Sequence, residues 1–173
     1  MPATPQELFA RLDELAIPSR TWRHPPLRTV EESRALRGEI PGIHCKNLLV
    51  KDKKGAFWLV VCREDRRIDF RAIEITLGAA RLSFARPEAL AEVLGVTPGA
   101  VTPFALINDR KRQVRVVLDR GLLGAEPVNY HPLENTATTQ IAAADLLRFI
   151  AACGHVPQVV DFDSLPLPSA HLA

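Results

Sequence analysis

The sequence predicts one α/β domain in which helices surround a curved, mixed and mostly antiparallel sheet that is barrel-like in shape. Helix and strand patterns interleave along the 173 residues, and no linker or internal repeat divides them. Several strand pairs are joined by turns too short for a crossover helix, which predicts antiparallel neighbours. We therefore expect a single domain over residues 1–173, with residues 157–173 forming an extended, proline-rich tail.

Five segments carry helix signals. The first begins at Pro5, because Thr4 can cap it, proline fits the first helical position and Glu7 completes a capping box; it stops before Pro18. A glycine ends most of the other predicted helices, because the residue after a helix often adopts a left-handed conformation that favours glycine. These further helices are expected at 30–38, 69–77, 86–94 and 142–153.

Six segments are expected to form strands. The runs 46–52 and 57–62 flank the turn Asp52-Lys53-Lys54-Gly55, which is a hairpin signal. A second pair, 103–107 and 114–118, is expected to meet through the charged turn 108–113. The remaining strands are expected at 21–24 and 137–141.

The composition excludes several classes of protein. The apolar fraction of 47% and the charged fraction of 24% are typical of a soluble globular protein. No apolar run is long enough to span a bilayer, and no secretory signal is visible. Three scattered cysteines, without zinc-ligand spacing, indicate neither a disulfide framework nor a structural metal. We expect a cytoplasmic protein without a cofactor, and neither DNA nor a membrane as partner.

The net charge of +2 does not by itself indicate a nucleic-acid partner. Local basic clusters nevertheless suit a surface that follows phosphates, although a solvated face interspersed with acids is the commoner explanation. The clusters are Arg20, Arg23, Arg28, Arg34 and Arg37; Lys46, Lys51, Lys53 and Lys54; and Arg110, Lys111, Arg112 and Arg115.

Three polar segments, each next to an expected strand, together predict one site. Lys46 and Asn47 open an apolar strand, where a cation beside an amide could clamp phosphate and ribose, although a surface lysine is the commoner arrangement. His131 could orient a carbonyl or bind an α-amino group when neutral, although a lone histidine is more often structural. The other candidates for substrate binding are Gly99, Ala100, Val101, Thr102, Phe104, Asn135 and Thr138. No hydrolase-type nucleophile elbow accompanies them.

These segments resemble a known family. The strings His24-Pro25-Pro26-Leu27-Arg28-Thr29-Val30-Glu31-Glu32, Lys46-Asn47-Leu48, Gly99-Ala100-Val101-Thr102-Pro103-Phe104 and His131-Pro132-Leu133-Glu134-Asn135-Thr136 are similar to those of freestanding prolyl-tRNA editing proteins. That family is related to the editing domain inserted in bacterial prolyl-tRNA synthetase and to the bacterial Cys-tRNA(Pro) deacylases. The similarity runs from about Pro5 to Leu165.

The resemblance implies a fold of the prolyl-tRNA synthetase editing-domain type and a deacylase that removes alanine from tRNA(Pro). It maps the catalytic positions of the family onto Lys46, Asn47 and His131, with the glycine-containing turn at Gly99 to Val101. The expected partner is the acceptor end of tRNA(Pro), and docking on prolyl-tRNA synthetase is left open. A Cys-tRNA(Pro) deacylase of the same fold and a non-catalytic RNA-binding module remain as alternatives, and Leu27, Val50 and Phe104 are candidate walls of the amino-acid pocket.

Overall fold

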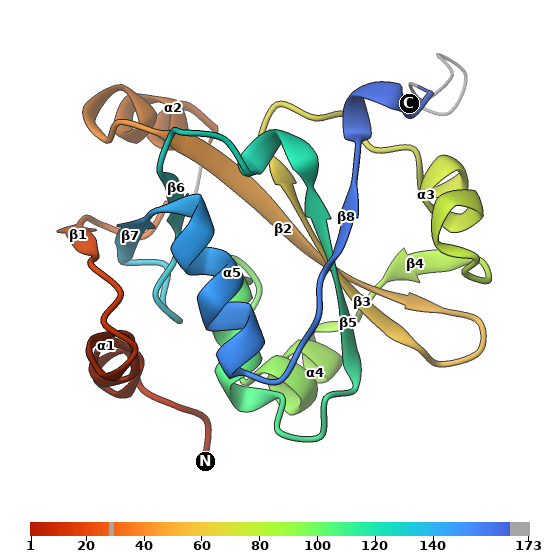
Figure 1. Ribbon diagram of the computed structural model, residues 1–173, viewed down its shortest axis with the longest axis horizontal. Helices are drawn as coiled ribbons and strands as arrows, with labels where there is room; N and C mark the ends of the chain where they lie inside the picture. Colours follow the sequence, from red (N-terminus) through yellow and green to blue (C-terminus); the bar gives the residue numbers. More distant parts are fainter. Residues whose placement is uncertain (28–29, 167–173) are drawn as a thin grey trace.

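A mixed sheet forms the centre of the protein in a computed structural model that describes residues 1–27 and 30–166. Its strands follow the order β1-β7-β6-β2-β3-β5-β8, and β4 pairs additionally with β2 (Figure 1). The strands are β1 (Arg20–Arg23), β2 (Ile43–Asp52), β3 (Phe57–Arg63), β4 (Leu82–Phe84), β5 (Val114–Asp119), β6 (Val128–Tyr130), β7 (Ala137–Ile141) and β8 (Gln158–Val160).

The long strand β2 joins the two halves of the sheet. Its first residues pair in parallel with β6, its middle pairs antiparallel with β3, and its last residues pair antiparallel with β4. The pairs β1/β7 and β6/β7 are also antiparallel, whereas β3/β5 and β5/β8 are parallel. The predicted mixed sheet is therefore confirmed, and it is open, because the pairing ends at β1 on one side and at β8 on the other.

Helices cover both faces of the sheet. Figure 1 shows α1 and α5 on one side of the molecule and α3 on the other. The helices are α1 (Pro5–Glu14), α2 (Val30–Glu39), α3 (Phe70–Leu77), α4 (Pro87–Ala89), α5 (Ala143–Ala152), the π-helical turn η1 (Leu90–Leu94), and the 3₁₀ helices η2 (Pro103–Asn108), η3 (Arg120–Leu122) and η4 (Phe162–Ser164). No helix among the described residues is long and apolar enough to cross a membrane.

The helix ends follow from local chemistry. Thr4 and Glu7 form the predicted capping box, with each backbone N–H donating to the other side chain. Asp69 caps α3 by accepting from the amides of Arg71 and Ala72, and Gly78 ends it with a left-handed φ of 64°.

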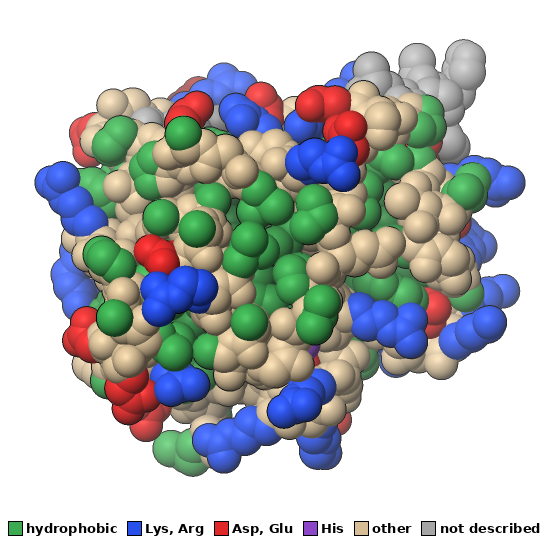
Figure 2. Space-filling view, viewed as in Figure 1, with side chains coloured by type: hydrophobic (Ala, Val, Ile, Leu, Met, Phe, Trp, Pro, Cys, Tyr) green, Lys and Arg blue, Asp and Glu red, His purple; other side chains and the backbone are tan. Residues whose placement is uncertain are grey.

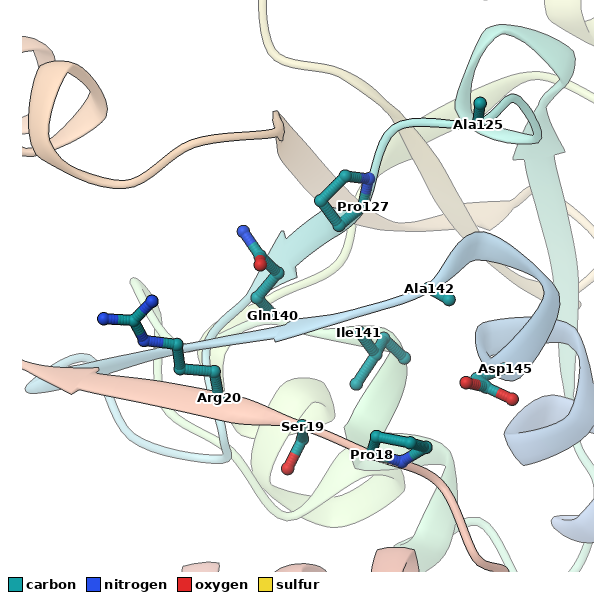
Figure 3. A pocket seen from close by; sticks show the side chains of 9 residues that line it. All are labelled: Pro18, Ser19, Arg20, Ala125, Pro127, Gln140, Ile141, Ala142 and Asp145. Atoms are coloured by element: carbon teal, nitrogen blue, oxygen red, sulfur yellow. The ribbon is translucent and has the colours of Figure 1, made fainter.

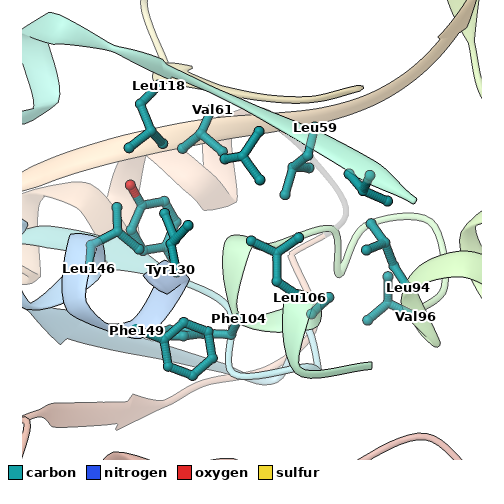
Figure 4. Packing of buried hydrophobic residues seen from close by; sticks show 14 of the residues in the cluster. Leu59, Val61, Leu94, Val96, Phe104, Leu106, Leu118, Tyr130, Leu146 and Phe149 are labelled. Atoms are coloured by element: carbon teal, nitrogen blue, oxygen red, sulfur yellow. The ribbon is translucent and has the colours of Figure 1, made fainter. Parts of the chain in front are cut away.

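Two apolar clusters lie on opposite faces of β2 and β3. Alternate residues of a strand point to opposite faces, so Leu49, Leu59 and Val61 join the larger cluster while Val50 and Val60 join the smaller one. In the larger cluster the Phe104 ring packs edge-on against Tyr130 and Phe149, with ring centroids 5.9 and 5.4 Å apart (Figure 4). This packing fixes the end of β6 that leads into the candidate site.

The predicted strand 103–107 is wrong, because these residues form the 3₁₀ helix η2. Thr102 accepts a hydrogen bond from the Phe104 amide, and Pro103 occupies the first helical position. A short, fully buried apolar run does not distinguish strand from helix by its pattern. The predicted hairpin through 108–113 is absent for the same reason.

The tail contains β8, which pairs in parallel with the edge of β5. The short strands β4, β6 and β8 were not predicted, since three residues carry too little alternation to be recognised. Arg28, Thr29 and the end of the predicted tail, 167–173, lie outside the described residues.

Candidate active site

The polar residues Asn47, His131 and Thr138 line one pocket of about 100 Å³. It lies where the first half of β2 approaches β6 and β7, so strand pairing brings together residues that are distant in sequence. The volume corresponds to roughly three water molecules, which limits an occupant to a small group. The other lining residues are Leu27, Ser33, His44, Cys45, Glu64, Asn129 and Tyr130.

The His131 side chain is held as a neutral imidazole. Its Nδ1 lies 2.8 Å from the carbonyl oxygen of Ala137, which can only accept, so Nδ1 carries the proton and Nε2 is an acceptor. Burial lowers the pKa of His131, outweighing the bond to Ala137, and the nearby His24 lowers it further. This arrangement favours binding of a hydrogen-bond donor at Nε2.

His24 orients a second group of the pocket. Its Nδ1 is 2.8 Å from the Pro25 carbonyl oxygen and its Nε2 is 2.9 Å from Thr138 Oγ1. In the neutral ring the Thr138 hydroxyl therefore donates to Nε2 and keeps its lone pairs for another donor. The sequence indicated no role for His24, because its position beside a threonine follows from the pairing of β1 with β7.

One buried polar atom at the pocket has no partner. Asn47 Oδ1 makes no hydrogen bond with the described residues, whereas Tyr130 Oη interacts with the Cys45 thiol. Because buried polar groups are nearly always paired, this exception indicates a place where a ligand completes the bonding. Burial and the Cys45 thiol hold the pKa of Tyr130 well above its usual range, so its hydroxyl stays neutral.

The lining of the pocket offers hydrogen-bond acceptors. Asn47, His131 and Thr138 contribute neutral polar groups, and Glu64 also lies in the wall. Acceptors of this kind suit the N–H groups of an amino group. The expectation that the site holds a phosphate stays a prediction.

Lys46 lies on the opposite face of the sheet. It pairs with Cys62, whose side chain belongs to the smaller cluster, while Asn47 pairs with Val61 of the larger one. The Lys46 ammonium donates to the carbonyl oxygen of Arg66. The expected clamp of Lys46 and Asn47 in one cleft is therefore not formed here, because consecutive residues of a strand face opposite sides.

The predicted turn at Gly99 lies beside the segment that carries His131. Gly99 has a φ of 89°, and Asn135 Nδ2 would lie 3.7 Å from a Cβ placed on it. Val101 is half-buried against the larger cluster. Ala100, Thr102 and Phe104 are 2% exposed or less, so their side chains cannot reach a substrate in this conformation and their influence on the site is indirect.

Of the three candidate pocket walls, only Leu27 lines the pocket. Val50 is buried in the smaller cluster, on the other face of β2, and Phe104 lies in the larger cluster. The closeness of these residues to the motifs in the sequence did not show on which face of the sheet each side chain lies.

A larger cavity of about 370 Å³ lies between β1, β7 and the start of α5 (Figure 3). Its charged groups have partners elsewhere: Asp145 accepts from Arg148, and the Arg20 guanidinium lies 4.6 Å from the Trp22 ring centroid. It contains no unpaired buried polar atom of the described chain. The smaller pocket is therefore the better candidate.

The sequence matches one family model over most of the chain. Residues 24–149 match the profile of the aminoacyl-tRNA editing domain, so the chain belongs to that family and with it to the aminoacyl-tRNA deacylases. No group of three or more His, Cys, Asp or Glu side chains among the described residues could hold a metal ion.

Individual relatives cover nearly the whole chain. It is 36% identical over 157 residues to the prolyl-tRNA editing protein ProX of Acetoanaerobium sticklandii, covering 90% of this chain and 96% of the relative. It is 40% identical over 160 residues to prolyl-tRNA synthetase associated domain-containing protein 1 of Danio rerio, covering 91% and 87%. The fold also matches a candidate trans-editing enzyme for prolyl-tRNA synthetase with a TM-score of 0.70 and 22% identity, covering 93% and 97%.

Proposed function

We propose that the protein hydrolyses mischarged Ala-tRNA(Pro) in trans, releasing alanine from the 3′-terminal ribose. The observation that carries this proposal is the small pocket with an unpaired Asn47 Oδ1 and the acceptor Nε2 of a neutral His131. Such a pocket suits the α-amino group and the short side chain of alanine. The names of the relatives, which refer to prolyl-tRNA editing and to prolyl-tRNA synthetase, support the identity of the tRNA.

The reaction requires little chemistry from the protein. A water oxygen attacks the ester carbonyl carbon, its proton passes to solvent through the neighbouring ribose 2′-hydroxyl, and the 3′-oxygen leaves with a proton. Asn47 Oδ1, His131 Nε2 and Thr138 Oγ1 would hold the amino-acid part so that the carbonyl faces that water. None of the described cysteines is needed as a nucleophile.

A second site is needed because alanine is smaller than proline. A synthetase pocket built for proline admits the smaller alanine, since each missing methylene is worth only about 1–3 kcal/mol. A pocket that accepts alanine and is too small for the proline ring corrects this error. Overfilling a packed pocket costs about 1–3 kcal/mol or more, so rejection by size is effective in this direction.

We retain Lys46 as a proposed functional residue on the basis of the family resemblance. Its ammonium donates to the carbonyl oxygen of Arg66, which lies two residues after Glu64 in the pocket wall. Lys46 can therefore act in two ways: by positioning the segment 64–66, or by releasing Arg66 and contacting the end of the tRNA. Gly99, Val101 and Asn135 are proposed to border the path of the terminal nucleotide. We expect the protein to act in the cytoplasm on the acceptor end of tRNA(Pro), without a cofactor.

Deacylation assays with Ala-, Cys- and Pro-tRNA(Pro) test the proposal. Preferential release of alanine supports it, and preferential release of cysteine favours the related deacylase activity. Tight binding of tRNA(Pro) without release of any amino acid would identify a binding module instead. An Asn47→Leu protein serves as the negative control, because leucine fills the same space without an acceptor.

A further inference from the structure

The cavity of about 370 Å³ between β1, β7 and the start of α5 adjoins the pocket at Asn47. Gln140 lines the cavity and Asn129 lines the pocket, and the Gln140 amide donates to Asn129 Oδ1 across 3.3 Å. These two side chains form a wall that the two spaces share. A group bound in the cavity would therefore lie beside a group bound in the pocket.

The residues at this wall lie on one face of the sheet. Arg20 of β1 pairs with Gln140 of β7, which pairs with Asn129 of β6. Asn129 in turn pairs with His44 of β2. Residues directly opposite one another on paired strands point to the same side. The first two of these residues line the cavity and the last two line the pocket, so both spaces lie on this face.

The cavity, the shared wall and the pocket follow one another along β6 and its flanking residues. Pro127 lines the cavity, Asn129 belongs to the wall and His131 lines the pocket. The antiparallel strand β7 repeats this order, from Gln140 at the cavity to Thr138 in the pocket. Two residues of a strand span about 7 Å. One extended nucleotide of an RNA strand can cover such a step.

The lining of the cavity suits a nucleobase. Its volume falls within the range of small-molecule sites, and most of its wall is apolar. Figure 3 shows Arg20 beside Gln140 at one end of the cavity and Asp145 at the other. The carboxylate of Asp145 disfavours a phosphate but can accept from the N–H groups of a base edge. The apolar lining residues are Pro18, Ala125, Pro127, Ile141 and Ala142.

The guanidinium group of Arg20 provides a planar surface for stacking. It lies 4.6 Å from the centroid of the Trp22 ring, and this cation–π contact holds it. No carboxylate of the described chain forms an ion pair with Arg20. Unpaired RNA bases stack on arginine planes of this kind. In Figure 2, Lys and Arg side chains lie at the left edge of the molecule, where Figure 1 places β1, and they favour the approach of an RNA strand from there.

We propose that this cavity binds the base of the penultimate nucleotide of the RNA whose aminoacyl end occupies the pocket at Asn47. The inference rests on the proposed function. Asn135 lies in the loop between β6 and β7, at the end of this strand pair opposite the cavity, and Gly99 lies against it. The terminal nucleotide takes that side of the pocket. The nucleotide before it then extends to the other side, where Arg20 and Gln140 receive its base.

Binding of an acceptor-stem RNA hairpin with an uncharged 3′ end, measured by fluorescence anisotropy, tests the proposal. For the wild type, an abasic penultimate nucleotide should weaken binding about fivefold or more. Arg20→Gln should weaken binding of the intact RNA by a similar factor and of the abasic RNA by less than about twofold, because both changes remove the same stack. Arg23→Gln removes the same charge from the opposite face of β1 and should leave the effect of the abasic nucleotide unchanged.

Two further variants separate stacking from charge. Arg20→Lys keeps the charge but loses the planar group, so it should reduce the dependence on the penultimate base as Arg20→Gln does. Ala125→Phe fills the cavity from an exposed position and should have the same effect with Arg20 intact. An Arg20→Lys protein with the full dependence on this base would overturn the proposal, as would coupling of Arg20 to the terminal base instead.

Hydrolysis assays keep this inference apart from the proposed function. Addition of the penultimate nucleotide to an alanyl ester of adenosine should raise kcat/KM for the wild type, and Arg20→Gln should lose that gain. If no aminoacyl-tRNA is hydrolysed but Arg20→Gln still loses the base dependence of binding, the proposed function fails and the base site stands. If alanine is released and Arg20→Gln binds both RNAs as the wild type does, the base site fails and the proposed function stands.

Discussion

His131 Nδ1 donates to the carbonyl oxygen of Ala137 across 2.8 Å, and this bond closes the segment that joins β6 to β7. The turn between them contains Leu133 with a φ of 68°, a left-handed conformation that is costly for residues other than glycine. The same bond that restrains this strained turn fixes the tautomer of His131. Backbone geometry and the chemistry of the site are thus set by one contact.

The pH dependence of activity should follow His131. Its pKa is lowered by burial, so the ring stays neutral and Nε2 remains an acceptor to pH values below the ordinary histidine pKa of about 6.5. We expect kcat/KM for Ala-tRNA(Pro) to stay level from pH 8 to about 6.5 and to fall at lower pH. Measuring the same profile with His131→Gln, which cannot titrate, should remove the part of the acid decline that is due to this residue.

The free energy of unfolding should also decrease as the pH falls. A histidine whose pKa is lower in the folded state binds more protons when unfolded, so the free energy of unfolding decreases as the pH falls below about 6.5 and is fully retained above it. Denaturant titrations of the wild type and of His131→Gln at pH 7.5 and 5.5 measure this. A wild type that loses no more stability on acidification than the variant would contradict the assignment.

A substitution of Asn47 should lower the activity of the protein without lowering its stability. Its Oδ1 is buried without a partner, so it contributes nothing to folding that a similar apolar side chain could not. Asn47→Leu is expected to lower kcat/KM about 10- to 100-fold while the melting temperature stays equal or rises. Asn47→Asp keeps an acceptor and should retain more activity. A large loss of stability in Asn47→Leu would show that the amide has a structural role.

Lys46→Ala is expected to reduce deacylation at least tenfold in a protein that remains folded. The ammonium bond to the Arg66 carbonyl is worth about 1.5–3 kcal/mol, less than the roughly 5–15 kcal/mol by which a typical domain is stable. Circular dichroism and thermal unfolding check the fold, and single-turnover deacylation gives the rate. Wild-type turnover by the folded variant would rule out a functional role for Lys46.

Cys45 should be dispensable although it lines the pocket. Burial raises the pKa of its thiol to about 12, so the nucleophilic thiolate is essentially absent at neutral pH. We expect Cys45→Ser to deacylate Ala-tRNA(Pro) within a few-fold of the wild-type rate and iodoacetamide to inactivate the wild type slowly. An acyl-thioester trapped on Cys45 would require a different mechanism.

The sequence predicted the residue types of the site better than their arrangement. Asn47, His131 and Thr138 do meet at one pocket, although the sequence predicted only the pairing of β2 with β3, and not the strand β6 that His131 follows. The sequence predicted that Lys46 and Asn47 share one cleft because they are adjacent in the chain. Consecutive residues of a strand point to opposite faces of the sheet, so the two side chains are separated. Local capping and turn signals located α1 and α3 well, since they depend on a few neighbouring residues.

What could not be predicted depends on long-range contacts. The buried run 103–107 became a 3₁₀ helix through the Thr102 cap and its packing against Tyr130 and Phe149. The roles of His24 and Glu64 required knowledge of which strands lie side by side. Such pairing over a hundred residues leaves no mark in local periodicity.

The last prediction concerns the exclusion of proline. Leu27 is half-buried and lines the pocket, so its truncation enlarges a space of only about 100 Å³. Leu27→Ala should therefore raise the hydrolysis of Pro-tRNA(Pro) severalfold or more while alanine release persists, since overfilling the pocket no longer costs as much.

A matched control comes from β2. Leu48 is also half-buried but packs against the smaller cluster on the opposite face, so Leu48→Ala should leave the ratio of proline to alanine release unchanged. Initial rates with both charged tRNAs give that ratio for the wild type and the two variants. If Leu27→Ala behaves as Leu48→Ala does, this wall does not exclude proline. Selectivity would then have to arise from the α-amino group, which is primary in alanine and secondary in proline, acting on Asn47 Oδ1 and His131 Nε2.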